Sequence, residues 1–492
     1  MEKTQINIIE KFKNILLVVL VFTTILLLYF LWGSKSLEAF IFSDDSESYE
    51  VLTSEKVLTP DEVILGRGNE DYIVATSKKE ELWNNEILGT FRNFSQETNI
   101  LVEEITKEKY KAAMKYPSII ARFQYDMPFS EFCDRFNINQ QQGYDNISNL
   151  TEIGFSKGSK ESAFIYDGSK KKYYWLLGNK DLQIFKKVDD ISAQQAATYF
   201  PLKTYLGTES TNQTLIPVES PEAIVPIDYK RDSETGEKEA AESMAQSYFG
   251  KTLDFTRKIE ESNGKIIYMY GYGQKVLIIN PKDGSIEYKE EIKGNNSEQK
   301  SMFESLDTAL TFISHHGGFK TAEGEKIEPN LESVSAIDDK KGCYRFIFDF
   351  KIGKNRLFYE ENAPVTIDVK DGQVSYFRRE LINFDGNQIQ KKSNQERISA
   401  MNMLAMNYNY ILTKSGMEDK QEPKAISFED VANKIENLYT GYLKPAVEQQ
   451  NEGTVYKEKK LQLVPVWVVE VNGVFLYFDL YDGKPEGYSK AY

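Results

Sequence analysis

The sequence predicts an α+β protein with a single N-terminal transmembrane helix, followed by a multi-domain ectodomain of antiparallel sheets covered by helices. Three observations lead to this prediction. An uncharged run occupies residues 15–32. The chain after it alternates stretches of helical apolar spacing with stretches rich in β-branched and aromatic residues. In the second half, a pattern of one helix followed by strands recurs three times, which is typical of sheets covered by helices on one face.

The run at residues 15–32, ILLVVLVFTTILLLYFLW, contains no charged residue. As a helix it would be roughly 27 Å long at about 1.5 Å per residue, enough to cross the hydrocarbon core of a bilayer. Lys11 and Lys13 precede the run, and acidic residues follow it from Asp44 onward. The positive-inside rule then predicts a cytoplasmic tail at residues 1–14 and an extracytoplasmic body.

A cleaved secretory signal peptide is the alternative interpretation of this run. The apolar region of a signal peptide has about 7–15 residues and precedes a small-x-small cleavage site. The run here is longer, and the sequence GSKSLEA after it offers a poor cleavage site. We therefore predict an uncleaved signal anchor and a single-pass protein of the cell membrane.

The composition excludes several classes of protein. The chain is 41% hydrophobic with 29 Phe and 30 Tyr, which excludes global disorder. Its net charge of −15 argues against binding to nucleic acid. Only two histidines occur, too few for a histidine-rich metal site, and we predict no metal and no cofactor. Cys133 and Cys343 are the only cysteines; we favour two separate buried thiols over one disulfide.

Changes in composition suggest the domain boundaries. Aromatic residues are scarce between residues 206 and 236, where Ser, Thr and Pro gather instead. The predicted order is a stalk at residues 33–50, an N-terminal α+β domain at 51–205, a linker at 206–236, a middle α+β domain of two modules at 237–392, and a C-terminal α+β domain at 393–492.

In the N-terminal domain, apolar residues at helical spacing predict a helix over residues 78–94. A second helix is expected over 107–116, where Pro117 ends it, and a third after Pro128. Runs of β-branched and aromatic residues predict the strands, which are expected at residues 62–66, 72–75, 118–125, 163–166 and 173–177. The last two flank an Asp-Gly turn, so they form a hairpin.

Each of the three later modules begins with an amphipathic helix, and these helices are expected at residues 237–249, 301–314 and 394–412. A further helix is expected at residues 428–442, because Ser427 and Asp430 form a capping pattern. The linker is expected to hold one short extended piece at residues 215–225. The strands of the modules are expected at residues 265–272, 275–279, 285–290, 343–352, 365–369, 373–379, 461–471 and 474–480, with Asp-Gly turns at Asp283, Asp371 and Asp482.

No group of residues in the sequence indicates catalysis. His315 and His316 end a helix just before two glycines, so we interpret them as part of a helix C-terminus. A histidine-based surface hydrolase is the alternative. The glycine pairs of the chain do not continue into a phosphate-binding motif, and the Asp-Gly turns lack the ligand series of a calcium loop.

The predicted site is therefore the membrane helix itself. Thr23 and Thr24 carry hydroxyl groups that could hydrogen-bond a neighbouring helix within the bilayer. With Tyr29 and Trp32, they are the residues that we assign to contacts with the membrane or with a partner helix. The alternative is that both hydroxyls bond back to carbonyl groups of their own helix.

The chain resembles the YycH family, and its C-terminal part is also similar to YycI. Besides the N-terminal anchor, the resemblance rests on several short motifs of core and turn residues. They are LTPDEVILG at residues 58–66, ELW at 81–83, SIIARF at 118–123, Met127-Pro128, LVPVWVV at 463–469, YFD at 477–479 and Asp482-Gly483.

This resemblance implies a non-enzymatic, membrane-anchored accessory protein of the WalK/WalR two-component system of Gram-positive bacteria. Such a protein would associate with a sensor histidine kinase and a YycI-like partner, or with a second copy of itself, and would adjust cell-wall metabolism. A different class of function stays open on the residues alone. The repeated helix-over-sheet modules would also suit an extracytoplasmic binding module or a protease inhibitor of the cell envelope.

Overall fold

The chain divides into two compact units, Met1–Val51 and Leu52–Tyr492, and the fold described below is that of the second. The computed structural model describes Leu20, Thr23 and most of residues 52–490. Within 52–490 the residues outside the description are 76–78, 98, 159, 179–181, 187–197, 207–211, 219–223, 232–237, 282–283, 293–298, 321–326, 338–339, 341, 381, 387, 389–392, 394, 418–425 and 447–460.

The predicted membrane helix at residues 15–32 lies outside the described residues, except for Leu20 and Thr23, which are both helical. Across the described part of the chain, no helix combines the length and the apolar character that a membrane crossing needs. The anchor therefore stays a prediction.

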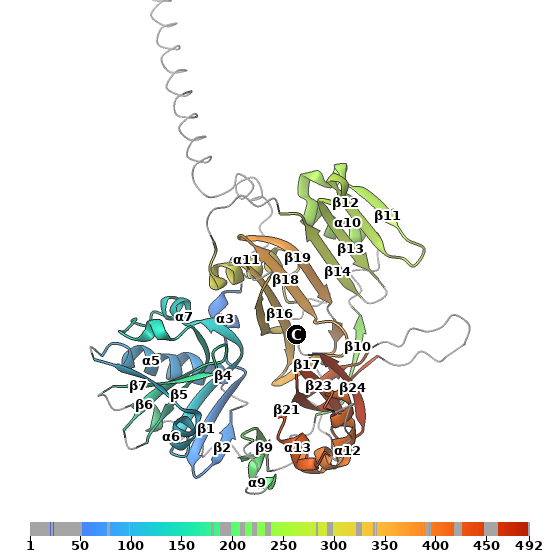
Figure 1. Cartoon of the computed structure of the whole chain (residues 1–492). Helices are drawn as coiled ribbons and strands as arrows, with labels where there is room; N and C mark the ends of the chain where they lie inside the picture. Colours follow the sequence, from blue (N-terminus) through green and yellow to red (C-terminus); the bar gives the residue numbers. More distant parts are fainter. Residues whose placement is uncertain are drawn as a thin grey trace, which may run out of the picture. The chain divides into compact units, whose positions relative to one another are not determined.

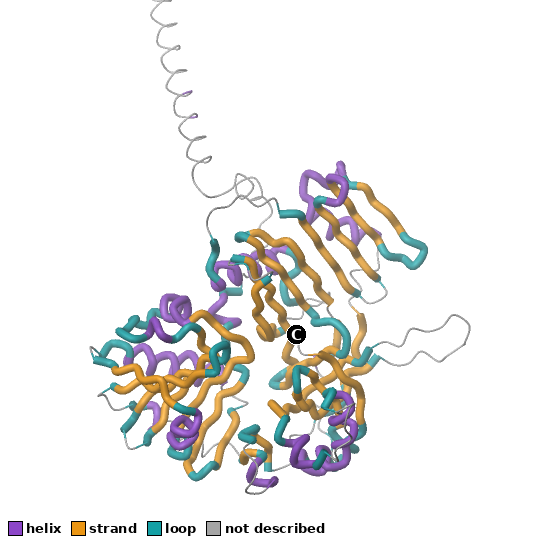
Figure 2. The backbone as a smooth tube through the Cα atoms, in the orientation of Figure 1, coloured by secondary structure: helices purple, strands orange, loops and turns teal. Residues whose placement is uncertain are grey.

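The N-terminal half of the second unit forms an antiparallel sheet of nine strands in the order β3-β7-β6-β5-β4-β1-β2-β8-β9 (Figures 1 and 2). Its strands are β1 Glu62–Gly68, β2 Asp71–Val74, β3 Leu101–Ile105, β4 Ser118–Pro128, β5 Asn149–Ser156, β6 Ser162–Asp167, β7 Lys172–Leu177, β8 Tyr199–Pro201 and β9 Leu215–Pro217. The five strands that the sequence predicted are all present.

The predicted helices of this half are also present. Its helical segments are α3 Ser54–Val57, α4 Lys79–Glu81, the π-helical η1 Leu82–Ile87, α5 Leu88–Phe94, α6 Lys107–Ala113, α7 Phe129–Arg135, η2 Tyr144–Asn146 and α9 Lys203–Leu206. Trp83 in η1 is fully buried, and its indole N–H donates to the carbonyl oxygen of Leu58 at 3.1 Å. Its ring meets that of Phe123 edge-on, with centroids 5.2 Å apart, so this helix is fixed on the sheet by one aromatic contact and one hydrogen bond.

The rest of the unit is built from three helix-and-sheet modules that share a sheet of fifteen strands. Their helical segments are α10 Lys238–Phe249, η4 Gly250–Phe255, η5 Gly271–Gly273, α11 Met302–His315, α12 Ala400–Lys414 and α13 Phe428–Ala432. Their strands are β10 Ile227–Arg231, β11 Arg257–Glu260, β12 Ile266–Tyr270, β13 Lys275–Asn280, β14 Ser285–Glu290, β15 Glu328–Ala336, β16 Cys343–Ile352, β17 Asn355–Tyr359, β18 Val365–Lys370, β19 Gln373–Glu380, β20 Ile382–Phe384, β21 Ile435–Lys444, β22 Gln462–Val471, β23 Val474–Asp479 and β24 Pro485–Lys490.

The first two modules join edge to edge. Strand β14 of the first pairs antiparallel with β19 of the second, so β11 to β14 and β15, β16, β18 and β19 form one continuous surface. The third module attaches through β17, which pairs in parallel with β21. Helices α10, α11 and α12 each pack on strands of their own module (Figure 1). The predicted α+β class is thus confirmed for the described residues.

One helix prediction about this half is wrong. The helix expected at residues 428–442 ends at Ala432, and β21 follows from Ile435. The capping pattern does start a helix, since Ser427 and Asp430 form a capping box. The sequence after it is rich in aromatic and β-branched residues, and pairing with β22 over eight residue pairs favours the strand.

The segment expected as a linker, residues 206–236, contributes one strand to each sheet. Strand β9 extends the nine-stranded sheet, and β10 pairs with β20 and β22 of the larger one. Ile216, Ile227 and Tyr229 are buried in these strands, so apolar side chains fix this segment to both sheets. The helix expected from residue 394 begins later, at Ala400, where Ser399 caps it through the Asn402 N–H.

Candidate binding groove on the middle sheet

The candidate site follows from the alternation of side chains along β16, β18 and β19. Phe346 of β16, Ile367 of β18 and Phe377 of β19 lie side by side on the face that α11 covers, and all three are buried. The intervening side chains point to the opposite face, because successive residues of a strand lie on opposite sides of a sheet. The cross-strand register places Arg345 beside Asp368, and Asp368 beside Tyr376, on that opposite face.

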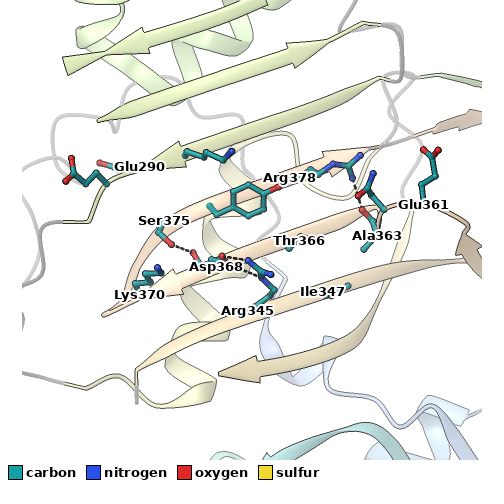
Figure 3. Close-up of a pocket in the computed structure, with 14 residues that line it drawn as sticks. Glu290, Arg345, Ile347, Glu361, Ala363, Thr366, Asp368, Lys370, Ser375 and Arg378 are labelled. Carbon is teal, nitrogen blue, oxygen red and sulfur yellow. Dashed lines mark hydrogen bonds and ion pairs between the residues drawn. The ribbon is translucent and has the colours of Figure 1, made fainter. Parts of the chain in front are cut away.

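This face is hollowed into a groove with a volume of about 650 Å³ (Figure 3). The groove runs along β18 and β19, and it also takes in parts of β14 and β16 and the segment before β18. Its lining residues are Lys289, Glu290, Glu291, Arg345, Ile347, Glu361, Asn362, Ala363, Thr366, Asp368, Lys370, Ser375, Tyr376 and Arg378. Most of these residues are charged, with equal numbers of positive and negative side chains. We call the groove that they line the sheet groove.

A bidentate ion pair lies in the floor of the sheet groove. Arg345 donates from Nε to Asp368 Oδ1 at 2.7 Å and from Nη2 to Oδ2 at 2.8 Å (Figure 3). The hydrogen bonds to Asp368 raise the pKa of the Arg345 guanidinium, and they do so more than the electrostatic attraction of the Asp368 carboxylate does. Ser375 donates its hydroxyl to the backbone oxygen of Asp368 at 3.4 Å. The paired side chains are held in place, as a preformed recognition surface requires.

The rest of the groove is fixed by Arg378 and Tyr376. Arg378 donates to the carbonyl oxygen of Ala363 at 2.9 Å and to the carboxylate of Glu380 at 2.8 Å. The Lys289 ammonium lies 5.7 Å from the centroid of the Tyr376 ring, within the range of a cation–π contact. Burial raises the pKa of the Tyr376 hydroxyl.

The sheet groove is suited to binding. Its charged side chains are held in place by hydrogen bonds, Arg345 to Asp368 and Arg378 to Glu380. The charges alternate with amide and hydroxyl groups, an arrangement that recognises an extended polar chain by hydrogen bonds and ion pairs.

A second, smaller cavity of about 220 Å³ lies where β1 and β4 of the first sheet face β15, β21, β22 and β23 of the second. Beside it, Arg356 is ion-paired with both Glu332 and Asp349. Burial raises the pKa of the Asp349 carboxyl well above its usual range. The Gln124 amide donates to the Tyr439 hydroxyl at 2.9 Å. This polar junction connects the two sheets.

The residues that the sequence singled out lie elsewhere. Thr23 is helical and donates its hydroxyl to the carbonyl oxygen of Leu20 at 2.9 Å, the alternative that we kept open for it. Thr24, Tyr29 and Trp32 lie outside the described residues.

The histidines have the structural role that we expected. His316 follows the last residue of α11, and its Nδ1 lies 2.7 Å from the carbonyl oxygen of Phe312. Gly317 and Gly318 adopt positive φ angles of 95° and 60° after it. Burial lowers the pKa of His316 to about 4. Its ring lies between those of Phe312 and Tyr248, away from the sheet groove.

Cys133 and Cys343 are both buried and unbridged. Burial raises the pKa of the Cys133 thiol to about 12. Of the three Asp-Gly turns, the one at Asp371 and Gly372 has φ angles of 49° and 76° and joins β18 directly to β19, as a tight hairpin does. Asp283 lies outside the described residues.

Sequence reasoning missed the sheet groove, although β18 carries a signal for it. The sequence VTIDVK alternates apolar and polar residues, which puts Thr366, Asp368 and Lys370 together on the face opposite the core. The matching residues of β16 and β19 could not be assigned to the same face without the register between the strands.

The chain matches a known protein family in sequence and two solved structures in fold. Residues 10–196 match the family described as YycH protein, N-terminal domain. No match was found among curated proteins. The fold is similar to the crystal structure of YycH from Bacillus subtilis, with a TM-score of 0.51 and 10% sequence identity over 87% of this chain and 97% of that one. The Bacillus megaterium YpeB C-terminal domain also matches, with a TM-score of 0.22 and 10% identity over 52% of this chain and 98% of that one.

Proposed function

We infer that this chain, which belongs to the YycH family through its N-terminal region at residues 10–196, is a regulatory accessory protein and not an enzyme. The observation that carries this inference is the family match itself. The sheet groove supports the regulatory role, because its charged side chains are held in fixed positions that suit recognition of a partner.

In its finer form, the proposal is a membrane-anchored regulator of a sensor histidine kinase that resembles WalK. Residues 15–32 would cross the membrane with the N-terminus in the cytoplasm, and the rest would lie outside. The family match begins at residue 10, so it includes this uncharged run. Partners would be the kinase and a YycI-like protein, or a second copy of the chain, and the output would be a change in cell-wall metabolism.

With only a short cytoplasmic tail, the chain would act on the kinase through helix contacts within the bilayer and through its extracytoplasmic body. Thr24, Tyr29 and Trp32 are the side chains proposed for the membrane contacts. Thr23 is the weaker candidate, because its hydroxyl already donates to Leu20.

The test is to exchange residues 15–32 for an unrelated membrane helix of equal length, with Lys11 and Lys13 kept so that the topology is preserved. Regulon output, measured with a reporter gene, should change, while the amount of membrane-bound protein should not. A control exchange of the stalk, residues 33–50, for a flexible sequence of equal length should leave output unchanged. Unchanged output after the helix exchange would contradict the proposal.

A second function is favoured by the sheet groove, namely an extracytoplasmic binding module or a protease inhibitor of the cell envelope. The groove is preformed, and its charged lining would suit a peptide or a wall polymer. Calorimetric titration of the purified full chain with wall fragments and short peptides tests this function. Heat that disappears with Arg378→Glu would support it, and no heat with any of these ligands would dispose of it.

A further inference from the structure

Strands β12 and β13 of the first module are apolar on both faces. Their sequences are IIYMY and, within KVLIIN, VLII. Both are continuous apolar runs, and they lack the alternation of apolar and polar residues that is typical of a strand with one solvent-exposed face. Such runs are typical of strands buried on both sides. One side is covered as expected: Tyr268, Leu277 and Ile279 are buried under α10 and η4.

The opposite side carries five aliphatic side chains in register. Ile259 of β11 lies beside Ile267 of β12, which lies beside Ile278 of β13. Two residues further along these strands, Met269 of β12 lies beside Val276 of β13. We call these five residues the outer apolar face. All five are partly exposed, and none belongs to or packs against a hydrophobic cluster that the described residues form.

Two protruding aromatic side chains lie at one end of this face. Phe255, the last residue of η4 and two positions before β11, is 78% exposed. Tyr272, in the turn between β12 and β13, is fully exposed. Exposed aromatic residues beside an apolar patch are characteristic of protein interfaces, where they act as anchors.

The charged residues around the outer apolar face indicate which sign of charge its partner should carry. The carboxylate of Glu287 is paired with Lys289 at 2.7 Å, and that of Glu261 accepts a hydrogen bond from Asn263 at 3.1 Å. In contrast, Arg257 and Lys265 point to the same face, and neither takes part in an ion pair among the described residues. Around the face, Arg257, Lys265 and Lys289 outnumber the carboxylates Glu261 and Glu287, so the partner should be acidic along its flanks.

The dimensions of the face indicate one helix. Three strands about 4.8 Å apart span roughly 10 Å, which is the width of an α-helix with its side chains. Along the strands, Ile267 and Met269 are two residues apart, so the aliphatic residues extend over roughly 7 Å, a little more than one helical turn. The other side of the same sheet is covered by a helix of this kind, α10.

We propose that the outer apolar face is a docking surface for an amphipathic helix of a partner protein. The apolar stripe of that helix would cover the five aliphatic residues, and its acidic flanks would meet Arg257 and Lys265. Strand β14 lies between this face and the sheet groove, so a longer partner segment would continue into the groove. This inference takes one assumption from the proposed function, namely that the chain acts by binding another protein.

Photocrosslinking in intact cells tests the proposal. Ile278→benzoylphenylalanine places the crosslinker at the centre of the face, and Met406→benzoylphenylalanine, on an exposed residue of α12, is the matched control. We expect an adduct from position 278 alone, whose crosslinked peptide has apolar residues at helical spacing with acidic residues beside them. An adduct between two copies of the chain, an adduct with lipid only, or the same peptides at both positions would overturn the proposal.

A charge variant provides the second readout. With the crosslinker at Phe255, the added Ile278→Lys substitution should lower the yield of the helix adduct by roughly tenfold or more, because it places a charge in an apolar interface. Thermal unfolding should stay unchanged, since Ile278 is outside the core. An undiminished yield would overturn the proposal. If the helix adduct forms but exchange of residues 15–32 leaves regulon output unchanged, the kinase proposal fails and the docking surface stands.

Discussion

Arg356 donates from Nη1 to the side-chain oxygen of Gln124 at 2.8 Å, although the two residues are 232 positions apart in the sequence. Gln124 lies in β4 of the nine-stranded sheet and Arg356 in β17 of the larger sheet. The same guanidinium lies 4.6 Å from the centroid of the Phe358 ring. The Arg356 side chain thus connects the two sheets, and it also neutralises the buried carboxylates of Glu332 and Asp349.

Removal of this guanidinium should destabilise the protein strongly. Arg356→Met keeps most of the side-chain volume but leaves Glu332 and Asp349, which are 5% and 4% exposed, without their cation. Breaking a buried ion pair by removing one partner costs about 3–5 kcal/mol. The free energy of unfolding, measured by urea titration with circular dichroism, should fall by about this amount.

Lys484→Met is the matched control for this substitution. The Lys484 side chain is 76% exposed and pairs with Asp482 at the surface, where water screens the attraction. The urea midpoint of this variant should not change measurably. If both variants unfolded at the same urea concentration, Arg356 would have no role in holding the sheets.

Two glycines should respond in opposite directions to alanine. A Cβ atom at Gly441 in β21 would lie 2.5 Å from the backbone oxygen of Arg356, which cannot move without disturbing the β17–β21 pairing. Gly441→Ala should therefore cost about 2 kcal/mol or more of the free energy of unfolding. A Cβ atom at Gly89 in α5 would meet nothing within 4 Å, so Gly89→Ala should stabilise by up to about 1 kcal/mol. Thermal unfolding of both variants checks this contrast.

Glu131 caps a helix that belongs to the other sheet. Its carboxylate accepts hydrogen bonds from the backbone N–H groups of Met302 at 2.9 Å and Phe303 at 3.4 Å, in the first turn of α11. Glu131→Ala should lower the free energy of unfolding by about 1–2 kcal/mol, the usual cost of a lost helix cap. Urea titration beside Glu108→Ala, which removes an exposed carboxylate from the first turn of α6, gives the comparison. Equal midpoints for the two variants would exclude a capping role for Glu131.

The sequence was sufficient for most helices and for the strands with strong β-formers. Trp83 with Ile87, and Met302 with Leu306, have the spacing of one helix face, and all four are buried in helices. The strand Ser118–Pro128 was predictable for the same reason, from a run of branched and aromatic residues. These elements are local, since the residues that define them are neighbours in the chain.

The elements that were missed depend on distant partners. Strand β21 begins two residues after a capped helix, and only its pairing with β22 decides that residues 435–444 are extended. Strand β11 reads RKIE, too short and too polar to be predicted alone. The sheet groove needs the register of four strands at once, and the antiparallel pairing of β14 with β19 has no sign in either strand.

The last prediction concerns His316 and the dependence of stability on pH. The ring of His316 is partly buried against Phe312 and Tyr248, and this burial lowers its pKa to about 4 in the folded chain. In the unfolded chain the pKa is about 6.5, so the unfolded chain binds the proton first as the pH falls. Stability from the neutral imidazole is thus complete above about pH 7 and is lost toward about pH 4, by about 2 kcal/mol.

The free energy of unfolding of the wild type and of His316→Phe, each measured by urea titration at about pH 7 and about pH 4.5, tests this prediction. Buried carboxyls such as Glu62, whose pKa burial raises, act in the opposite direction but equally in both proteins, so the comparison cancels them. The wild type should lose about 2 kcal/mol more than the variant between the two pH values. Equal losses in both proteins would mean that the His316 imidazole is protonated in the folded chain as easily as in the unfolded one.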